Sequence, residues 1–239
     1  MLVSGRHFDV EQRRKAVTRD RRLAVDLVER GCVVRWVYPE DDGHDEVADG
    51  VSLLPVRTIV PGFRSVEARL DDPPLEQTLS RSVRTDLPDV VHALAYGAGT
   101  STSVPWLADR LGVPCVVTLK GKEMLCHRGT LINERGENCS EWNRAERCAE
   151  CCLTSFAGGL GPAAAACGRL LARLQWISPF PQDLDFRNRL ELVTAGLMTA
   201  QRVVVTRIED VDLFGQFVDL IVQGAVVVLY VDPILLEIR

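Results

Sequence analysis

The chain has 239 residues, of which 46% are apolar and 26% charged, so we expect a domain with a substantial hydrophobic core. Its formal net charge of −5 argues against a nucleic-acid partner, because proteins that bind nucleic acids usually carry a basic surface. The N-terminal stretch MLVSGRHFDVEQRRK lacks an apolar segment followed by a small-residue cleavage site. We therefore predict no signal peptide and a cytoplasmic location.

Short apolar runs alternate with amphipathic helical patterns along the first half of the chain. A very short strand at 1–4 precedes a helix that includes 24–28 and ends at Gly31. Further strands are predicted at 33–38, 51–56, 89–95 and 114–119, and further helices at 73–88 and 104–111. This alternation predicts an α/β fold with a parallel sheet and right-handed crossovers.

The second half continues the same alternation after a polar stretch. Helices are predicted at 163–174, 190–197 and 213–220, and strands at 202–206 and 226–231. The most membrane-like stretch, 217–236, is interrupted by Asp219 and Asp232. Because a charged residue inside a spanning helix costs about 2.5–3.5 kcal/mol, we predict no transmembrane segment.

Several segments together resemble one enzyme family. DLPDVVHALAYGAG and LADRLGVPCVVTLKGKEMLCHRGTL resemble the N-terminal domain of family 4 glycosyltransferases of the GT-B fold, and RGCVVRWVYPEDD and AQRVVVTRIEDVDLFGQF resemble two of its other strand segments. The resemblance covers about residues 2–233. It implies a single Rossmann-like, GT-B N-terminal domain over 1–239, a parallel sheet flanked by helices, with a Cys-rich insertion at 122–160. It also implies that the C-terminal donor-binding domain is absent.

The resemblance implies a role in moving a sugar from a nucleotide sugar to an acceptor hydroxyl. A separate donor-domain subunit, or a missing donor-binding half, would hold the nucleotide sugar. The acceptor would be a sugar or a lipid-linked sugar. The alternative is a catalytically inactive, glycosyltransferase-like binding or scaffold protein, because two histidines of the family pattern are replaced. The catalytic-type His falls on Lys120 and another on Leu94, whereas His92 is retained.

Two sets of residues are therefore candidates for the site. His92 and Lys120 are the catalytic candidates, since open α/β sheets bind ligands at the carboxyl ends of their strands. The predicted acceptor or phosphate site comprises Tyr96, Gly97, Lys120 and Lys122. The alternatives are a partly buried, hydrogen-bonded histidine and ordinary solvated lysines.

Five of the eight cysteines lie between 126 and 152 in an otherwise polar segment. The C-x2-C pair Cys148 and Cys151 has the spacing of a zinc knuckle, and Cys126 and Cys139 could complete a tetrahedral site for a structural Zn²⁺. Cys152 could replace Cys151. Free thiols, or disulfides in an oxidising compartment, are the alternative, and a stand-alone zinc-binding module is a third functional hypothesis. A polar segment of this length is expected to need a cross-link, such as a bound metal, to remain ordered.

The other three cysteines lie in apolar patterns and are predicted to be small core residues: Cys32, Cys115 and Cys167. A group of basic residues precedes the first predicted helix face: Arg13, Arg14, Lys15, Arg19, Arg21 and Arg22. Such a group could make a peripheral contact with anionic lipid. We favour the alternative of a solvated helix face.

Overall fold

The computed structural model describes residues 1–4, 19–40, 45–56, 73–94, 96, 102–119, 122, 125–158, 183–205, 226–231 and 234–238. The strands are β1 (Leu2–Val3), β2 (Arg35–Pro39), β3 (Glu46–Ala48), β4 (Val51–Val56), β5 (Val91–Ala93), β6 (Cys115–Leu119), β7 (Arg202–Val205), β8 (Val226–Val231) and β9 (Ile234–Ile238). The helices are α1 (Arg19–Glu29), α2 (Pro73–Asp86), α3 (Val104–Arg110), α4 (Ala145–Gly158) and α6 (Asp183–Thr199).

These strands form one sheet in the order β3-β4-β2-β1-β5-β6-β7-β8-β9. The pairs from β4 to β8 are parallel, whereas β3 and β9 add antiparallel edges. The chain starts near the middle at β1, moves outward to one side through β2 and β4, and then returns to add β5 on the other side. This reversal is the topological switch point of a doubly wound sheet, where ligands bind outside the carboxyl ends of the strands.

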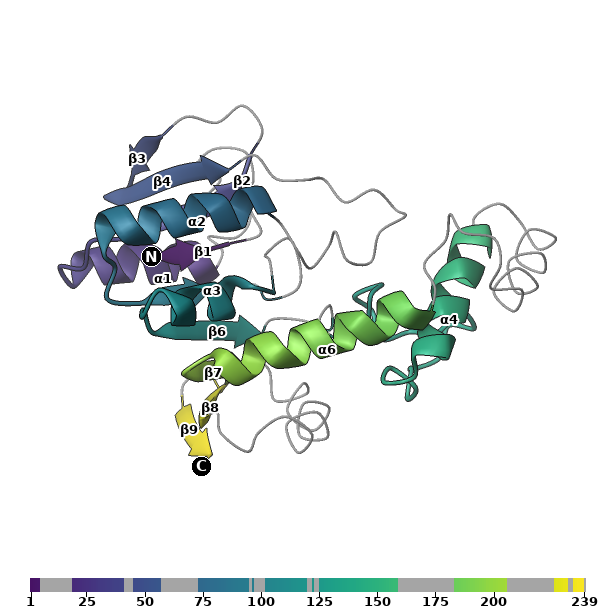
Figure 1. The fold of residues 1–239 in the computed structure, drawn as a ribbon. Coiled ribbons are helices and arrows are strands. Elements are labelled where there is room, and N and C mark those ends of the chain that lie inside the picture. The colour runs from purple at the N-terminus through teal and green to yellow at the C-terminus, as the bar shows by residue number, and fades with distance from the viewer. Residues whose placement is uncertain are drawn as a thin grey trace.

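Strands β1, β2 and β4 are buried on both faces, as their apolar sequences predict. In β2, Trp36 and Tyr38 belong to a cluster with Ala24 of α1, whereas Val37 points to the opposite face. That opposite face carries the larger cluster, which includes residues from α2, α3 and α6 (Figure 1). The alternation follows from the two-residue period of strand side chains.

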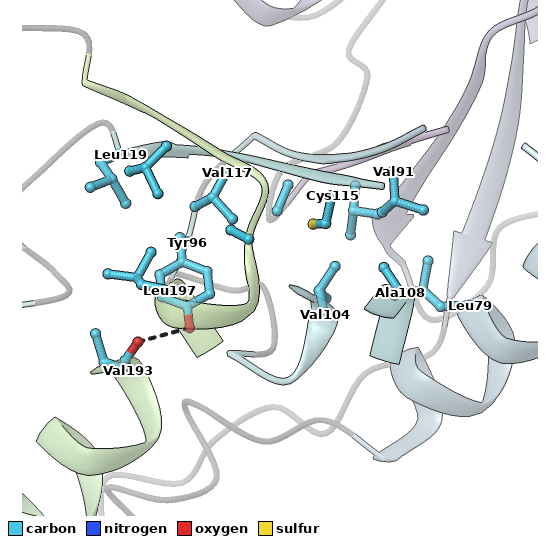
Figure 2. Packing of buried hydrophobic residues seen from close by; sticks show 14 of the residues in the cluster. Leu79, Val91, Tyr96, Val104, Ala108, Cys115, Val117, Leu119, Val193 and Leu197 are labelled. Atoms are coloured by element: carbon cyan, nitrogen blue, oxygen red, sulfur yellow. Dashed lines mark hydrogen bonds between the residues drawn. The ribbon is translucent and has the colours of Figure 1, made fainter. Parts of the chain in front are cut away.

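The larger cluster contains an unusually close approach of α6 to the loop that follows β5. Tyr96 is buried, and its hydroxyl lies 3.1 Å from the carbonyl oxygens of both Thr102 and Val193 (Figure 2). A Cβ atom on Gly196 would stand 2.0 Å from this hydroxyl and 2.4 Å from the Thr102 carbonyl oxygen. Glycine at position 196 therefore allows α6 to pack directly against the Tyr96 ring.

The predicted α/β fold with a mainly parallel sheet is confirmed, including the very short first strand. Three elements were not predicted, namely the antiparallel edges β3 and β9 and the helix α4. The helices predicted at 163–174 and 213–220 lie outside the described residues. Within the described ranges, no helix is long and apolar enough to cross a membrane. The single-domain assignment and the absence of a donor domain stay predictions.

The prediction that Cys32 is a core residue is wrong. Cys115 is fully buried, as predicted, but Cys32 is exposed. The physical reason is the end of α1, where Gly31 has a φ of 83° and the Cys32 amide donates to the Leu27 carbonyl. This αL turn directs the chain outward before β2 begins at Arg35. Cys167 lies outside the described residues.

Candidate functional site

The first candidate site is the rim formed by the carboxyl ends of β1, β5 and β6. Backbone hydrogen bonds join β1 to its two neighbours at this edge, from the Ser4 amide to the Val37 carbonyl of β2 (2.9 Å) and from the Leu94 amide after β5 to the Val3 carbonyl (2.8 Å). Because these strands are parallel, the side chains and amides that follow them meet at one edge.

His92 lies in β5, in register with Leu2 of β1 and Val116 of β6. Its Nε2 atom is 2.7 Å from the hydroxyl oxygen of Thr118, and its side chain is partly exposed. This hydrogen bond joins β5 to β6 and orients the His92 imidazole ring. Because Nε2 is bonded to Thr118, Nδ1 is the ring nitrogen left for other partners. A catalytic role for His92 stays a prediction, and the hydrogen bond to Thr118 could not be foreseen from spacing alone.

The other predicted rim residues have different surroundings. The Tyr96 side chain is 4% exposed and its hydroxyl is used within the core, so only its backbone could meet an acceptor. Leu94, at the position of a family histidine, is 1% exposed and packs in the α1-side cluster. Lys122 is exposed. Gly97 and Lys120 lie outside the described residues, so their predicted roles stay predictions.

The second candidate site is a cavity of about 210 Å³ between the 126–142 loops and α4. All five clustered cysteines line it: Cys126, Cys139, Cys148, Cys151 and Cys152. The lining residues all come from 126–152, and α6 extends from the sheet to pack against α4 (Figure 1). The four proposed ligands thus line one cavity, although no three of them stand as a ligand set in the described residues. Their role as metal ligands stays a prediction.

The predicted knuckle conformation of the C-x2-C pair is wrong. Cys148, Cys151 and Cys152 lie inside α4, which runs from Ala145 to Gly158. A knuckle requires a turn, whereas a helix places residues i, i+3 and i+4 on one face. The three thiols are therefore presented together by helical periodicity. Cys148 and Cys152 also pack against the small apolar cluster of Ala149 and Phe186.

The loop side of the cavity is shaped by a small hairpin. Ile132 and Asn138 form an antiparallel bridge, and the Asn133 side-chain oxygen accepts from the Arg135 and Glu137 amides at 2.9 Å each. Gly136 has a φ of 82° in this turn. The Cys139 amide then donates to the Leu131 carbonyl at 2.8 Å, which fixes the backbone beneath that thiol.

Charged side chains surround the thiols. Arg128 Nη1 donates to Cys151 Sγ at 3.4 Å and to the Ile132 carbonyl at 2.8 Å. Arg189 of α6 is 4% exposed, and its Nη1 donates to the Leu125 carbonyl at 3.3 Å. Glu134 lines the same cavity with an 8% exposed side chain. Its Oε1 is 3.4 Å from Arg147 Nη2, and its carboxylate also interacts with the Cys151 thiol.

As free thiols, the three cysteines of α4 are poor nucleophiles. Burial raises the pKa of Cys148 to about 12, and the neighbouring thiols of Cys126, Cys139 and Cys151 also raise this pKa, whereas Arg189 lowers it. Burial likewise raises the pKa of Cys152 to about 12. Burial also raises the pKa of Cys151, whereas the Arg128 hydrogen bond lowers it. Neutral thiols of this kind do not suit nucleophilic catalysis, since the thiolate is the reactive species.

Comparison with known proteins identifies the family. Residues 16–206 match the glycosyl transferase 4-like domain, which is most of the chain. The chain belongs to this family. No curated protein is a significant match. Among solved structures, the apo UGT2 of Phytolacca americana aligns over 89% of this chain and 46% of that protein, with 13% identity and a TM-score of 0.41. The chain thus spans about half the length of that protein.

Sequence reasoning missed several residues that shape the two sites of this glycosyl transferase 4-like domain. Thr118 was predicted only as part of a strand. Successive strand residues point to opposite faces, so Thr118 lies on the same face of the sheet as Val116, the residue paired with His92. Nothing in the sequence around Arg128 and Arg189, apart from their charge, indicated that they lie near the cysteines. The spacing of Arg189 from Val193 and Leu197, four and eight residues, could have indicated that it lies on the buried face of its helix.

Proposed function

We propose that this glycosyl transferase 4-like domain binds the acceptor in a sugar-transfer reaction and supplies one wall of the catalytic cleft. The single observation that carries the proposal is the family match over 16–206, in a sheet whose strand order reverses between β1 and β5. Doubly wound sheets bind ligands at such a reversal, and His92 and Thr118 lie near this rim. A donor-binding half, on the same polypeptide or on a separate one, would bring the nucleotide sugar to this rim.

In this function, the side chains near the rim position the acceptor hydroxyl. A hydroxyl group held beside an imidazole in hydrogen-bond contact can lose its proton as the new glycosidic bond forms. Thr118 orients the His92 ring, since a ring with one nitrogen bonded presents the other in a defined direction. Lys120 and Lys122 follow β6 and would favour an acceptor that carries a phosphate.

The test uses the chain together with its donor-binding half. The measured quantity is release of nucleoside diphosphate from UDP-glucose, UDP-N-acetylglucosamine and GDP-mannose, with polyprenyl phosphate or a simple glycoside as acceptor. The expected result is acceptor-dependent release with one pair. A His92→Ala variant should lose about 10²-fold of the rate, as expected for loss of a group that moves a proton.

Thr85→Ala provides the matched control, because Thr85 is exposed on α2 and its hydroxyl bonds the Arg81 carbonyl within its own helix. This variant should keep the wild-type rate. Acceptor-dependent release that is the same in wild type and His92→Ala would contradict the assignment of the acceptor to this rim. A complete absence of release with every donor and acceptor would contradict the transfer function itself.

A non-catalytic, glycan-binding or scaffold role is the second candidate, and one observation favours it. Leu94, at a histidine position of the family pattern, is buried in the apolar cluster rather than facing the rim. Lys120 also stands where the pattern has its other histidine. Lys120→His in the assembled protein separates the two roles. A rise in nucleotide release supports a degenerate enzyme, and no change supports a binding role.

A further inference from the structure

We propose that the cavity between the 126–142 loops and α4 binds one structural Zn²⁺ through the thiolates of Cys126, Cys139, Cys148 and Cys151. This inference is independent of the proposed acceptor site. Zinc prefers four thiolate ligands in a closed tetrahedral arrangement when its role is structural. The chain offers two ligands from one helix and two from the facing loops, which is the arrangement that cross-links separate segments.

The backbone already places the four cysteines around one space. Cys148 and Cys151 are three residues apart in α4 and share a helix face. Cys126 and Cys139 line the same cavity from the opposite side. Their amides donate to the Lys122 carbonyl at 2.7 Å and the Leu131 carbonyl at 2.8 Å, so their backbone positions are fixed.

The thiols converge on the metal only when they rotate into the cavity. In the part of the chain that the structure describes, no three Cys, His, Asp or Glu side chains stand as a ready ligand set. A cysteine thiol moves by rotation about one side-chain bond between staggered positions. The cavity of about 210 Å³ gives the four sulfur atoms room for that movement.

The charges around the cavity fit a bound thiolate cluster. One Zn²⁺ with four thiolates carries a net negative charge, and two guanidinium groups lie beside it, those of Arg128 and the buried Arg189. Arg128 donates to Cys151 Sγ, and a hydrogen bond of this kind from a residue that is not itself a ligand orients a metal-binding thiolate. Glu134 also lines this cavity, and its carboxylate is held by Arg147, whose Nη2 is 3.4 Å from Glu134 Oε1.

Cys151 rather than Cys152 is assigned as the fourth ligand. Cys152 packs with Cys148 against the apolar pair Ala149 and Phe186. Cys151 instead receives the Arg128 hydrogen bond and has the less buried thiol environment of the two. A thiolate ligand is favoured at the position with the cationic donor.

The test is metal analysis of the full chain, purified under reducing conditions from medium containing zinc. The expected result is about one zinc per chain in the wild type, as for a closed four-ligand site. Cys148→Ser/Cys151→Ser should lose at least about tenfold of this zinc content. Cys32→Ser, which alters an exposed cysteine outside the cavity, and Cys152→Ala should both retain it.

A second variant keeps the test decisive when serine variants fold poorly. Cys151→His replaces one zinc ligand by another and should retain zinc, whereas Cys151→Ser should not. Replacement of zinc by Co²⁺ should give the visible absorption bands of a tetrahedral thiolate site, and these bands should be lost in Cys139→Ser. A wild-type protein with no bound zinc, with either free thiols or disulfides found by mass spectrometry, would overturn the proposal. Retention of zinc by Cys148→Ser/Cys151→Ser would overturn it as well.

Discussion

Two regions of the molecule are ordered by different forces. The sheet region is held by apolar packing on both faces of the strands, with side chains such as Leu79, Val117 and Val193 almost fully buried. The cysteine segment, residues 125–158, has only a few apolar anchors, among them Leu125, Leu131 and Trp142. Its remaining contacts are turns, ion pairs and thiols around a cavity.

The comparison raises the question of what keeps the polar segment 125–158 ordered beside a large apolar core. Burial of a leucine or valine side chain contributes about 1.5–3 kcal/mol, so the sheet region needs no further support. Exposed ion pairs contribute about 0–1 kcal/mol each, too little to offset the conformational entropy of a long polar segment. A metal cross-link would provide the missing free energy where apolar side chains are scarce.

The largest effect is expected from a cavity in the sheet region. Leu79 of α2 is 1% exposed, and Leu79→Ala should lower the free energy of unfolding by about 2–5 kcal/mol, because a buried leucine leaves a void behind. Leu192 of α6 is 44% exposed and serves as the control, with a much smaller loss on Leu192→Ala. Urea unfolding measures both. Equal losses would contradict the description of the sheet region as tightly packed.

A smaller loss is expected where α6 meets the Tyr96 ring. Alanine normally stabilises a helix relative to glycine, but the Cβ of Gly196→Ala would stand 2.0 Å from the Tyr96 hydroxyl oxygen. We expect this variant to lose about 1–3 kcal/mol of unfolding free energy through overpacking. Ala195→Gly, at an exposed neighbour, should lose about 1 kcal/mol from helix propensity alone.

Tyr96→Phe makes this prediction sharper, because it removes the clashing hydroxyl oxygen. The double variant Gly196→Ala/Tyr96→Phe should show coupling, with a smaller loss than the sum of the two single changes. The Thr102 carbonyl at 2.4 Å limits the recovery. Strictly additive losses in thermal or urea unfolding would contradict the assigned contact between the helix and the ring.

The smallest effect is expected from the ion pairs of the cysteine segment. Arg147 contacts Glu134 at 3.4 Å, Glu141 at 3.0 Å and Glu150, and Arg147→Ala should lower the unfolding free energy by about 1 kcal/mol. The control is Arg144→Ala, because Arg144 is 63% exposed and pairs with Glu141. That change should lower it by less than about 0.5 kcal/mol. If Arg147→Ala alone disorders residues 125–158, ion pairs rather than a cross-link hold the segment.

The sequence allowed the sheet to be predicted well, because buried parallel strands and amphipathic helices leave periodic apolar patterns. The edges β3 and β9 were missed, since a three-residue exposed strand and a strand after Pro233 give weak patterns. Helix α4 was missed because its three cysteines suggested a zinc knuckle rather than a helix face. Cys32 was misplaced because the αL turn at Gly31 depends on backbone conformation, which an apolar pattern does not reveal.

The candidate sites were predicted only in part. The five clustered cysteines do line one cavity, and Cys148 and Cys151 share a side because residues three apart face the same way in a helix. The family pattern correctly indicated His92 near the rim, but the hydrogen bond to Thr118 depends on the register between β5 and β6. The position of Arg189 near the thiol cavity depends on the packing of α6, which brings residue 189 to residue 125.

Amide hydrogen exchange with and without zinc removal most directly tests whether the two regions are held by different forces. After chelation under reducing conditions, the amides of Cys126, Cys139 and Cys148, each hydrogen-bonded to a carbonyl, should lose protection. The amides of β5 and β6 should keep theirs, because their protection depends on apolar packing. Unchanged exchange in both regions, or equal loss in both, would contradict the account.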